Sequence, residues 1–150
     1  MSQCYDELLV QDLNEILKGC HMGVSVFTDL LGEAQNDKFK SILKKALECF
    51  HQHEMELSFR IRSFSAEIDD SPGLMASVSG LVEKFKAVMA DSDEELLKNA
   101  IRAMDMAMKA CQVFDEKHPA VTGTVRKILD QLMKDYRQIY RELTEFRLNL

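Results

Sequence analysis

The sequence has little of what turn-rich, secreted or membrane-spanning proteins need. Its 150 residues include two prolines and six glycines, too few for the many tight turns of an all-β protein. No run of about 18 apolar residues occurs, so nothing predicts a membrane-spanning helix. The start, MSQCYDELLVQDLNEIL, lacks the basic residues and apolar run of a secretion signal. The four cysteines are scattered without Cys-x-x-Cys spacing, which is typical of reduced thiols, and we expect a cytoplasmic protein.

The chain does have enough apolar residues for one core. Hydrophobic residues make up 46% of it, and 150 residues is a common domain length, so we expect a single domain over residues 1–150. Acidic residues outnumber basic ones by 25 to 19, which gives a net charge of −6. This charge predicts that neither nucleic acid nor an anionic membrane surface is a partner.

Apolar residues recur every three or four positions, the period of a helix that buries one side, along four long segments. These segments span about 6–34, 37–66, 92–117 and 121–148. Short polar turns join the first segment to the second and the third to the fourth, so each pair predicts an antiparallel hairpin. The connection between the hairpins is long and contains the pattern of a short helix at about 74–90. The sequence therefore predicts an all-α, up-down-down-up four-helix bundle with one crossover, which is ferritin-like connectivity.

His53 is the polar residue that interrupts the apolar stripe of the second segment, and Glu56 follows it after three residues. With Cys49 they form a Cys-x-x-x-His-x-x-Glu series, in which the three side chains share one helix surface. One interpretation is a partial metal site in which His53 and Glu56 bind iron, manganese or zinc. The other, which we favour, is a core histidine hydrogen-bonded to Glu56 or to a tyrosine of the fourth helix. His118 is expected to be a surface or helix-end residue, and near the end of the third helix it would gain from the helix dipole.

Inward-facing acids are scarce elsewhere in the sequence. A carboxylate-bridged metal pair in a bundle needs a Glu from each of two helices and Glu-x-x-His from each of the other two. The third predicted helix instead places Met104 in its apolar stripe with Asp105 beside it, and the fourth places Tyr136 and Tyr140. We therefore expect a degenerate metal site at most, with no catalytic residues and no bound cofactor.

Several short motifs have the spacing and apolar identity of a known group of proteins. They are Leu13-Asn14-Glu15-Ile16-Leu17, Gly23 with Phe27, Phe39-Lys40-Ser41-Ile42-Leu43, His53-Glu54-Met55-Glu56-Leu57, the segment from Gly80 to Lys86, Asp93-Glu94-Glu95, and Asp105. In these motifs the chain resembles bacterial ferritin-like proteins of unknown function, which are often linked to stress responses. The resemblance covers most of residues 9–147 and implies a ferritin-like fold.

The chain departs from this group where the group carries potential metal ligands. Val24-Ser25 stands in place of acids in the first helix, Met104 in place of a glutamate in the third, and Tyr140 in place of a histidine in the fourth. Only His53 and Glu56 match. The resemblance therefore implies the fold, together with a two-metal site that has lost most of its ligands.

The function that we favour is a non-enzymatic bundle that acts through protein contacts or assembly, and the resemblance implies a link to stress responses. We expect a symmetric homodimer whose interface uses apolar residues on the outside of the bundle, such as Val26, Leu30, Phe59 and Phe85. A protein partner other than a second copy is the other possibility for this surface.

Two further functions stay open. One is a metal-binding or redox protein that uses His53, Glu56 and acids such as Glu15. The other is a module that binds a small ligand in a pocket between its helices.

Overall fold

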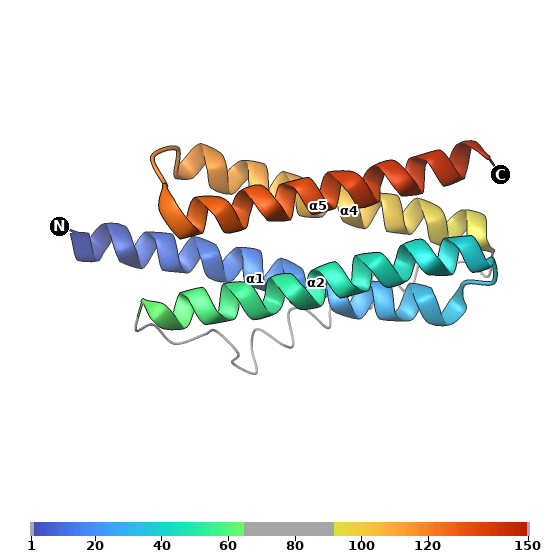
Figure 1. Cartoon of the computed structure of the whole chain (residues 1–150), viewed down its shortest axis with the longest axis horizontal. Coiled ribbons are helices and arrows are strands. Elements are labelled where there is room, and N and C mark those ends of the chain that lie inside the picture. Colours follow the sequence, from blue (N-terminus) through green and yellow to red (C-terminus); the bar gives the residue numbers. More distant parts are fainter. Residues whose placement is uncertain (1, 65–91, 150) are drawn as a thin grey trace.

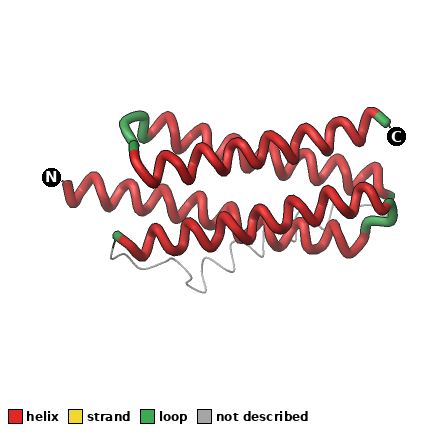
Figure 2. Tube along the Cα trace, viewed as in Figure 1, coloured by secondary structure: helices red, strands yellow, loops and turns green. Residues whose placement is uncertain are grey.

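Four long helices make up the fold in the computed structural model, which describes residues 2–64 and 92–149 (Figure 1). They are α1 (Ser2–Glu33), α2 (Asp37–Ser63), α4 (Asp93–Lys117) and α5 (Gly123–Leu148). Figure 2 shows that short turns join α1 to α2 and α4 to α5. The prediction of an all-α bundle built from two hairpins is confirmed. The helix predicted at 74–90 lies outside the described residues.

The helices run up, down, down and up around one core (Figure 1). Asp12, early in α1, contacts His118 at the end of α4, and Asp93 at the start of α4 contacts the backbone just after α1. Hence α1 and α4 are antiparallel neighbours. On the other side of the bundle α5 packs against α2, and Lys45 forms an ion pair with Glu142 at 2.8 Å. The two hairpins therefore pack side by side, so that each helix has two neighbours.

Side chains in the turn between α1 and α2 set where α2 begins and link it to the other hairpin. The Asn36 side chain caps α2 by accepting a hydrogen bond from the Phe39 N–H at 3.0 Å. The Asp93 carboxylate accepts hydrogen bonds from the N–H groups of Gln35 and Asn36 at 2.9 and 2.8 Å. The first residue of α4 thus also holds the turn of the first hairpin in place.

The buried side of α1 is wider than the sequence predicts. Val26 and Leu30 are 1% and 0% exposed, so the expectation that they form an outer surface is wrong. The physical reason is that α1 packs against both α2 and α4, and a helix with two neighbours buries a broad arc of its surface. Phe59, by contrast, is 75% exposed. Phe85, the fourth residue of the expected interface, lies outside the described residues.

His118 caps the end of α4, which agrees with the helix-end alternative, but it is buried and the expectation of a surface residue is wrong. Its Nε2 atom lies 2.6 Å from the carboxylate of Asp12, and its ring packs 4.7 Å from the ring of Phe114. Because α4 is antiparallel to α1, the end of α4 lies beside the first turns of α1, and the imidazole closes that end of the core.

The composition of the helices also bears on membrane insertion. None of the helices that the structure describes is both long enough and apolar enough to cross a membrane.

Candidate functional site

His53 lies in the interior of the bundle, where α2 faces α5, and it is 1% exposed. Its Nδ1 atom is 3.2 Å from the hydroxyl of Tyr136, and its Nε2 atom is 2.9 Å from a carboxylate oxygen of Asp135. The Tyr136 hydroxyl is in turn 3.5 Å from the sulfur of Cys20. We call Cys20, Tyr136, His53 and Asp135 the core network. It connects α1, α5 and α2 through one series of hydrogen bonds.

The chemistry of the four groups indicates which group donates and which accepts in each hydrogen bond of the core network. A carboxylate only accepts hydrogen bonds, so the Nε2–H group of His53 donates to Asp135. With a neutral imidazole, Nδ1 then accepts from the Tyr136 hydroxyl, whose oxygen accepts from the Cys20 thiol. Both ring nitrogens of His53 are satisfied, which is what a buried imidazole requires. The arrangement fits the interpretation of His53 as a core histidine bonded to a tyrosine of the fourth helix.

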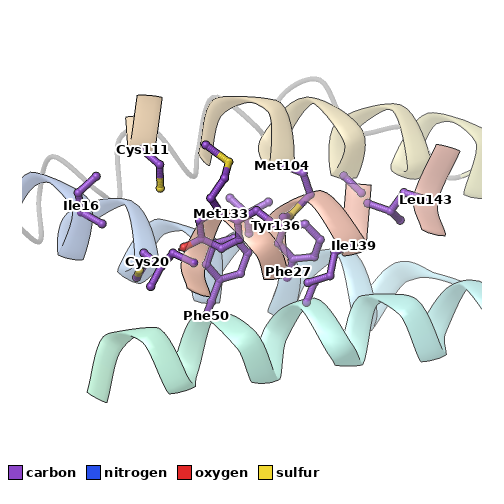
Figure 3. Close-up of a cluster of buried hydrophobic side chains, with 14 of the residues drawn as sticks. Ile16, Cys20, Phe27, Phe50, Met104, Cys111, Met133, Tyr136, Ile139 and Leu143 are labelled. Atoms are coloured by element: carbon purple, nitrogen blue, oxygen red, sulfur yellow. Dashed lines mark hydrogen bonds between the residues drawn. The ribbon is translucent and has the colours of Figure 1, made fainter. Parts of the chain in front are cut away.

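Aromatic rings pack around the core network and hold it in one geometry. The Tyr136 and His53 rings form a T-shaped contact at a centroid distance of 5.1 Å, and Phe50 packs against Tyr136 at 5.3 Å. Phe27 then packs against Phe50 at 5.5 Å (Figure 3). Gly23 makes room for this cluster, because a Cβ atom there would lie 2.5 Å from the Phe50 ring. Tight packing of side chains from α1 and α2, two of the helices that the network connects, therefore holds it in position.

The buried thiols of Cys20, within the core network, and of Cys111 are poor nucleophiles. Burial raises the pKa of Cys20 and of Cys111 from 9.0 to about 12, and it also raises the pKa of Tyr136 well above 10.0. Burial disfavours the thiolate and phenolate forms because low-dielectric surroundings solvate charge poorly. These groups therefore stay neutral at physiological pH, and the thiolate that nucleophilic or redox catalysis by cysteine needs is absent from both positions.

The two acids predicted to share a metal site with His53 form no hydrogen bond with it in the described structure. Glu56 is half-buried and accepts a hydrogen bond from Gln52 at 2.9 Å, one turn away on the same helix. Glu15, the additional acid considered on α1, is exposed. Among the residues that the structure describes, no three His, Cys, Asp or Glu side chains are arranged to hold a metal ion.

Asp135 connects the core network to the surface. Its side chain is 29% exposed, and its other carboxylate oxygen accepts a hydrogen bond from Gln131 at 2.8 Å. It lines a groove of about 530 Å³ between α2 and α5, together with Cys49 and Gln138. Solvent thus reaches one end of the network, whereas Cys20 at the other end is buried.

Sequence reasoning missed Asp135 and Cys20 as partners of the histidine. Asp135 directly precedes Tyr136, which the sequence placed in the apolar stripe of the fourth helix. A residue next to such a stripe lies at its edge, where one side chain can reach inward while remaining partly solvated. That position was the available signal, but it does not indicate which residue of α2 the carboxylate meets.

The core network predicts a measurable loss of stability for Tyr136→Phe. Removal of the hydroxyl leaves Nδ1 of His53 without its donor and the Cys20 thiol without its acceptor, so we expect the free energy of unfolding to fall by about 1–2 kcal/mol. Urea denaturation followed by circular dichroism measures this change. Tyr140→Phe is the matched control, one turn further along α5, and should change the free energy by less than about 0.5 kcal/mol. Equal effects of the two substitutions would contradict the prediction.

Comparison with known proteins identifies a family for the chain. Residues 9–117 match the sequence model of the family described as Domain of unknown function (DUF2383), and the chain belongs to this family. The match covers most of α1 and all of α2 and α4, so it includes Cys20 and His53, whereas Asp135 and Tyr136 lie beyond its end. Neither the curated proteins nor the solved structures give a significant match.

Proposed function

We propose that this member of the DUF2383 family is a non-enzymatic, ferritin-like bundle that works through contacts with other protein chains. In this proposal the core network occupies the place where related bundles would hold metals, and it serves to align the helices. The outer faces of the bundle carry the function.

The observation that supports the proposal most directly is the bonding of His53. Both of its ring nitrogens are hydrogen-bonded, Nδ1 to Tyr136 at 3.2 Å and Nε2 to Asp135 at 2.9 Å, so neither nitrogen faces an open space. The core around it is filled by apolar and aromatic side chains. A side chain that is fully bonded within a packed core fits a structural role better than a ligand or catalytic role.

The order of helix directions supports the ferritin-like part of the proposal. An up-down-down-up bundle has one long connection, and ferritin-like bundles have this connectivity. In this chain the long connection lies between α2 and α4, where residues 65–91 join the two hairpins. The cytoplasmic location and the link to stress responses remain predictions from the sequence and its resemblance.

The alternative is a metal-binding protein in which His53 and Glu56 take up iron, manganese or zinc. The feature in its favour is Asp135, whose partly exposed carboxylate contacts His53. Asp135 and Cys49 also line the same groove between α2 and α5. The alternative requires His53 to exchange a hydrogen-bond partner for a metal ion.

Elemental analysis and melting temperature together separate the two functions. For protein purified without chelators, we expect substoichiometric iron, manganese and zinc. We also expect that adding each divalent ion leaves the melting temperature unchanged, because only a ligand that binds the folded state stabilises it. In His53→Leu and in Glu56→Gln, as in the wild type, added divalent ions should leave the melting temperature unchanged.

A stoichiometric metal in the wild type would overturn the proposal, as would a rise of several degrees that either variant abolishes. Glu56→Gln keeps this test informative even if His53→Leu folds poorly, because Glu56 is only half-buried and its amide analogue keeps the same size.

A further inference from the structure

The outer face of α2 carries large apolar side chains in contact with solvent. Met55 and Phe59 are 68% and 75% exposed. They lie one helical turn apart, and each is two positions from the fully buried Leu57. Two positions correspond to about 200° around a helix, so both side chains lie opposite the core. We call Met55 and Phe59 the α2 apolar face.

Charges of opposite sign stand at the two ends of the α2 apolar face. Glu48 is exposed two turns before Met55, and Arg62 is exposed on the turn after Phe59. Gln52 is exposed between Glu48 and Met55. His51 is exposed beside Gln52, so along the outside of α2 the order is acid, histidine, amide, two apolar side chains and base. Such a pattern is complementary to itself when it is reversed.

We propose that the α2 apolar face binds a second copy of the chain, with the two α2 helices antiparallel about a two-fold axis at Leu57. This inference rests on the proposed function, because it names the protein contact through which the bundle acts. Met55 of each copy then packs on Phe59 of the partner subunit. Arg62 lies opposite Gln52 of the partner subunit and within one turn of its Glu48.

Charge complementarity selects this arrangement over the parallel one. In the antiparallel pair, symmetry gives two contacts between Arg62 and Glu48, one at each end of the apolar face. A parallel pair would instead set Glu48 against Glu48 and Arg62 against Arg62, and like charges in contact repel. The antiparallel pair also covers both copies of Phe59, and an aromatic ring contributes a large buried apolar area.

Sedimentation velocity on the full chain tests the inference. At micromolar concentrations we expect a species of twice the 17.2 kDa mass of one chain. Phe59→Ser should raise the dimer Kd at least about tenfold, because the free energy gained by burying a phenylalanine side chain corresponds to such a factor or more. Val113→Ser is the matched control, because Val113 is 48% exposed on α4 and lies outside the α2 apolar face. It should leave the Kd unchanged.

Charge reversal tests the geometry of the pair. Glu48→Arg and Arg62→Glu should each raise the Kd about three- to tenfold at low salt, because each places like charges together at both ends of the interface. The double variant should restore the wild-type Kd. In a parallel pair, by contrast, neither single variant would raise the Kd, because the wild type already places like charges opposite each other.

Each outcome decides the inference. It is overturned if the wild type is a monomer, if Phe59→Ser dimerises as well as Val113→Ser, or if the double variant fails to recover what the single ones lose. The metal measurements do not depend on any of these results. Failure of the dimer at this face is therefore distinguishable from failure of the non-enzymatic, metal-free function.

Discussion

Gly23→Ala should destabilise the bundle, although alanine is the better helix former. At a solvent-exposed position inside a helix, glycine to alanine raises the free energy of unfolding by about 1 kcal/mol. At Gly23 the new Cβ atom would lie 2.5–2.6 Å from three carbons of the Phe50 ring. Phe50 is 1% exposed and is held between Phe27 and Tyr136, so its ring has little room to move. Overpacking of this kind costs about 1–3 kcal/mol, and we expect a net loss of free energy of unfolding in urea denaturation.

Gly19 supplies the control for this prediction on the same helix. A Cβ atom at Gly19 would meet no atom within 4 Å, so Gly19→Ala should stabilise the protein by up to about 1 kcal/mol. Combining Gly23→Ala with Phe50→Leu should cost less than the sum of the single changes, because the smaller side chain relieves the clash. Stabilisation by Gly23→Ala would show that Phe50 moves aside freely, contrary to the prediction.

The fold was predictable because its signals are local. Apolar spacing and turn residues such as Asn36 act within a few positions of each other, and they predicted four helices whose ends the structure reproduces closely. Two hairpins with short turns leave few ways to form a bundle. The short helix predicted at 74–90 stays a prediction, since it lies outside the described residues.

Which side chains face inward was harder to predict, because burial depends on how many neighbours a helix has. A single stripe through Val24 and Leu31 describes a helix with one neighbour. With two neighbours, α1 buries Val26 and Leu30, which the sequence assigned to the surface. Val24 and Leu31 are only partly buried. The helix-end position of His118 was predicted, but its burial was not, since that burial depends on packing against α1, which supplies Asp12.

The candidate site was predictable in part. His53 stands out in the sequence as the polar residue of an apolar stripe, and its bond to a tyrosine of the fourth helix was one of the expected partners. Its second partner, Asp135, comes from 82 residues further along the chain. Which carboxylate meets His53 depends on the register between α2 and α5, and periodicity within one helix carries no information about that register.

The protein should lose stability in alkaline solution because of its buried thiols. Cys20 and Cys111 have a pKa of about 12 in the folded state, compared with 9.0 for an ordinary thiol. Above pH 9 the unfolded chain therefore releases protons that the folded chain keeps, and unfolding becomes more favourable as pH rises. Their contribution is complete below about pH 9 and is lost progressively up to about pH 12. Between pH 8 and 10.5 we expect a loss of about 2 kcal/mol per thiol, or about 4 kcal/mol together.

Urea denaturation at pH 8, 9 and 10.5, with a reductant present, measures this dependence. The slope of the free energy against pH is the informative quantity, because each buried thiol adds up to one proton to it. Cys111→Ala should make the slope shallower by about one proton, whatever the substitution does to stability at pH 8. Cys111 serves this test better than Cys20, whose sulfur also contacts the Tyr136 hydroxyl. An unchanged slope in Cys111→Ala would mean that this thiol ionises as readily in the folded chain as in the unfolded one.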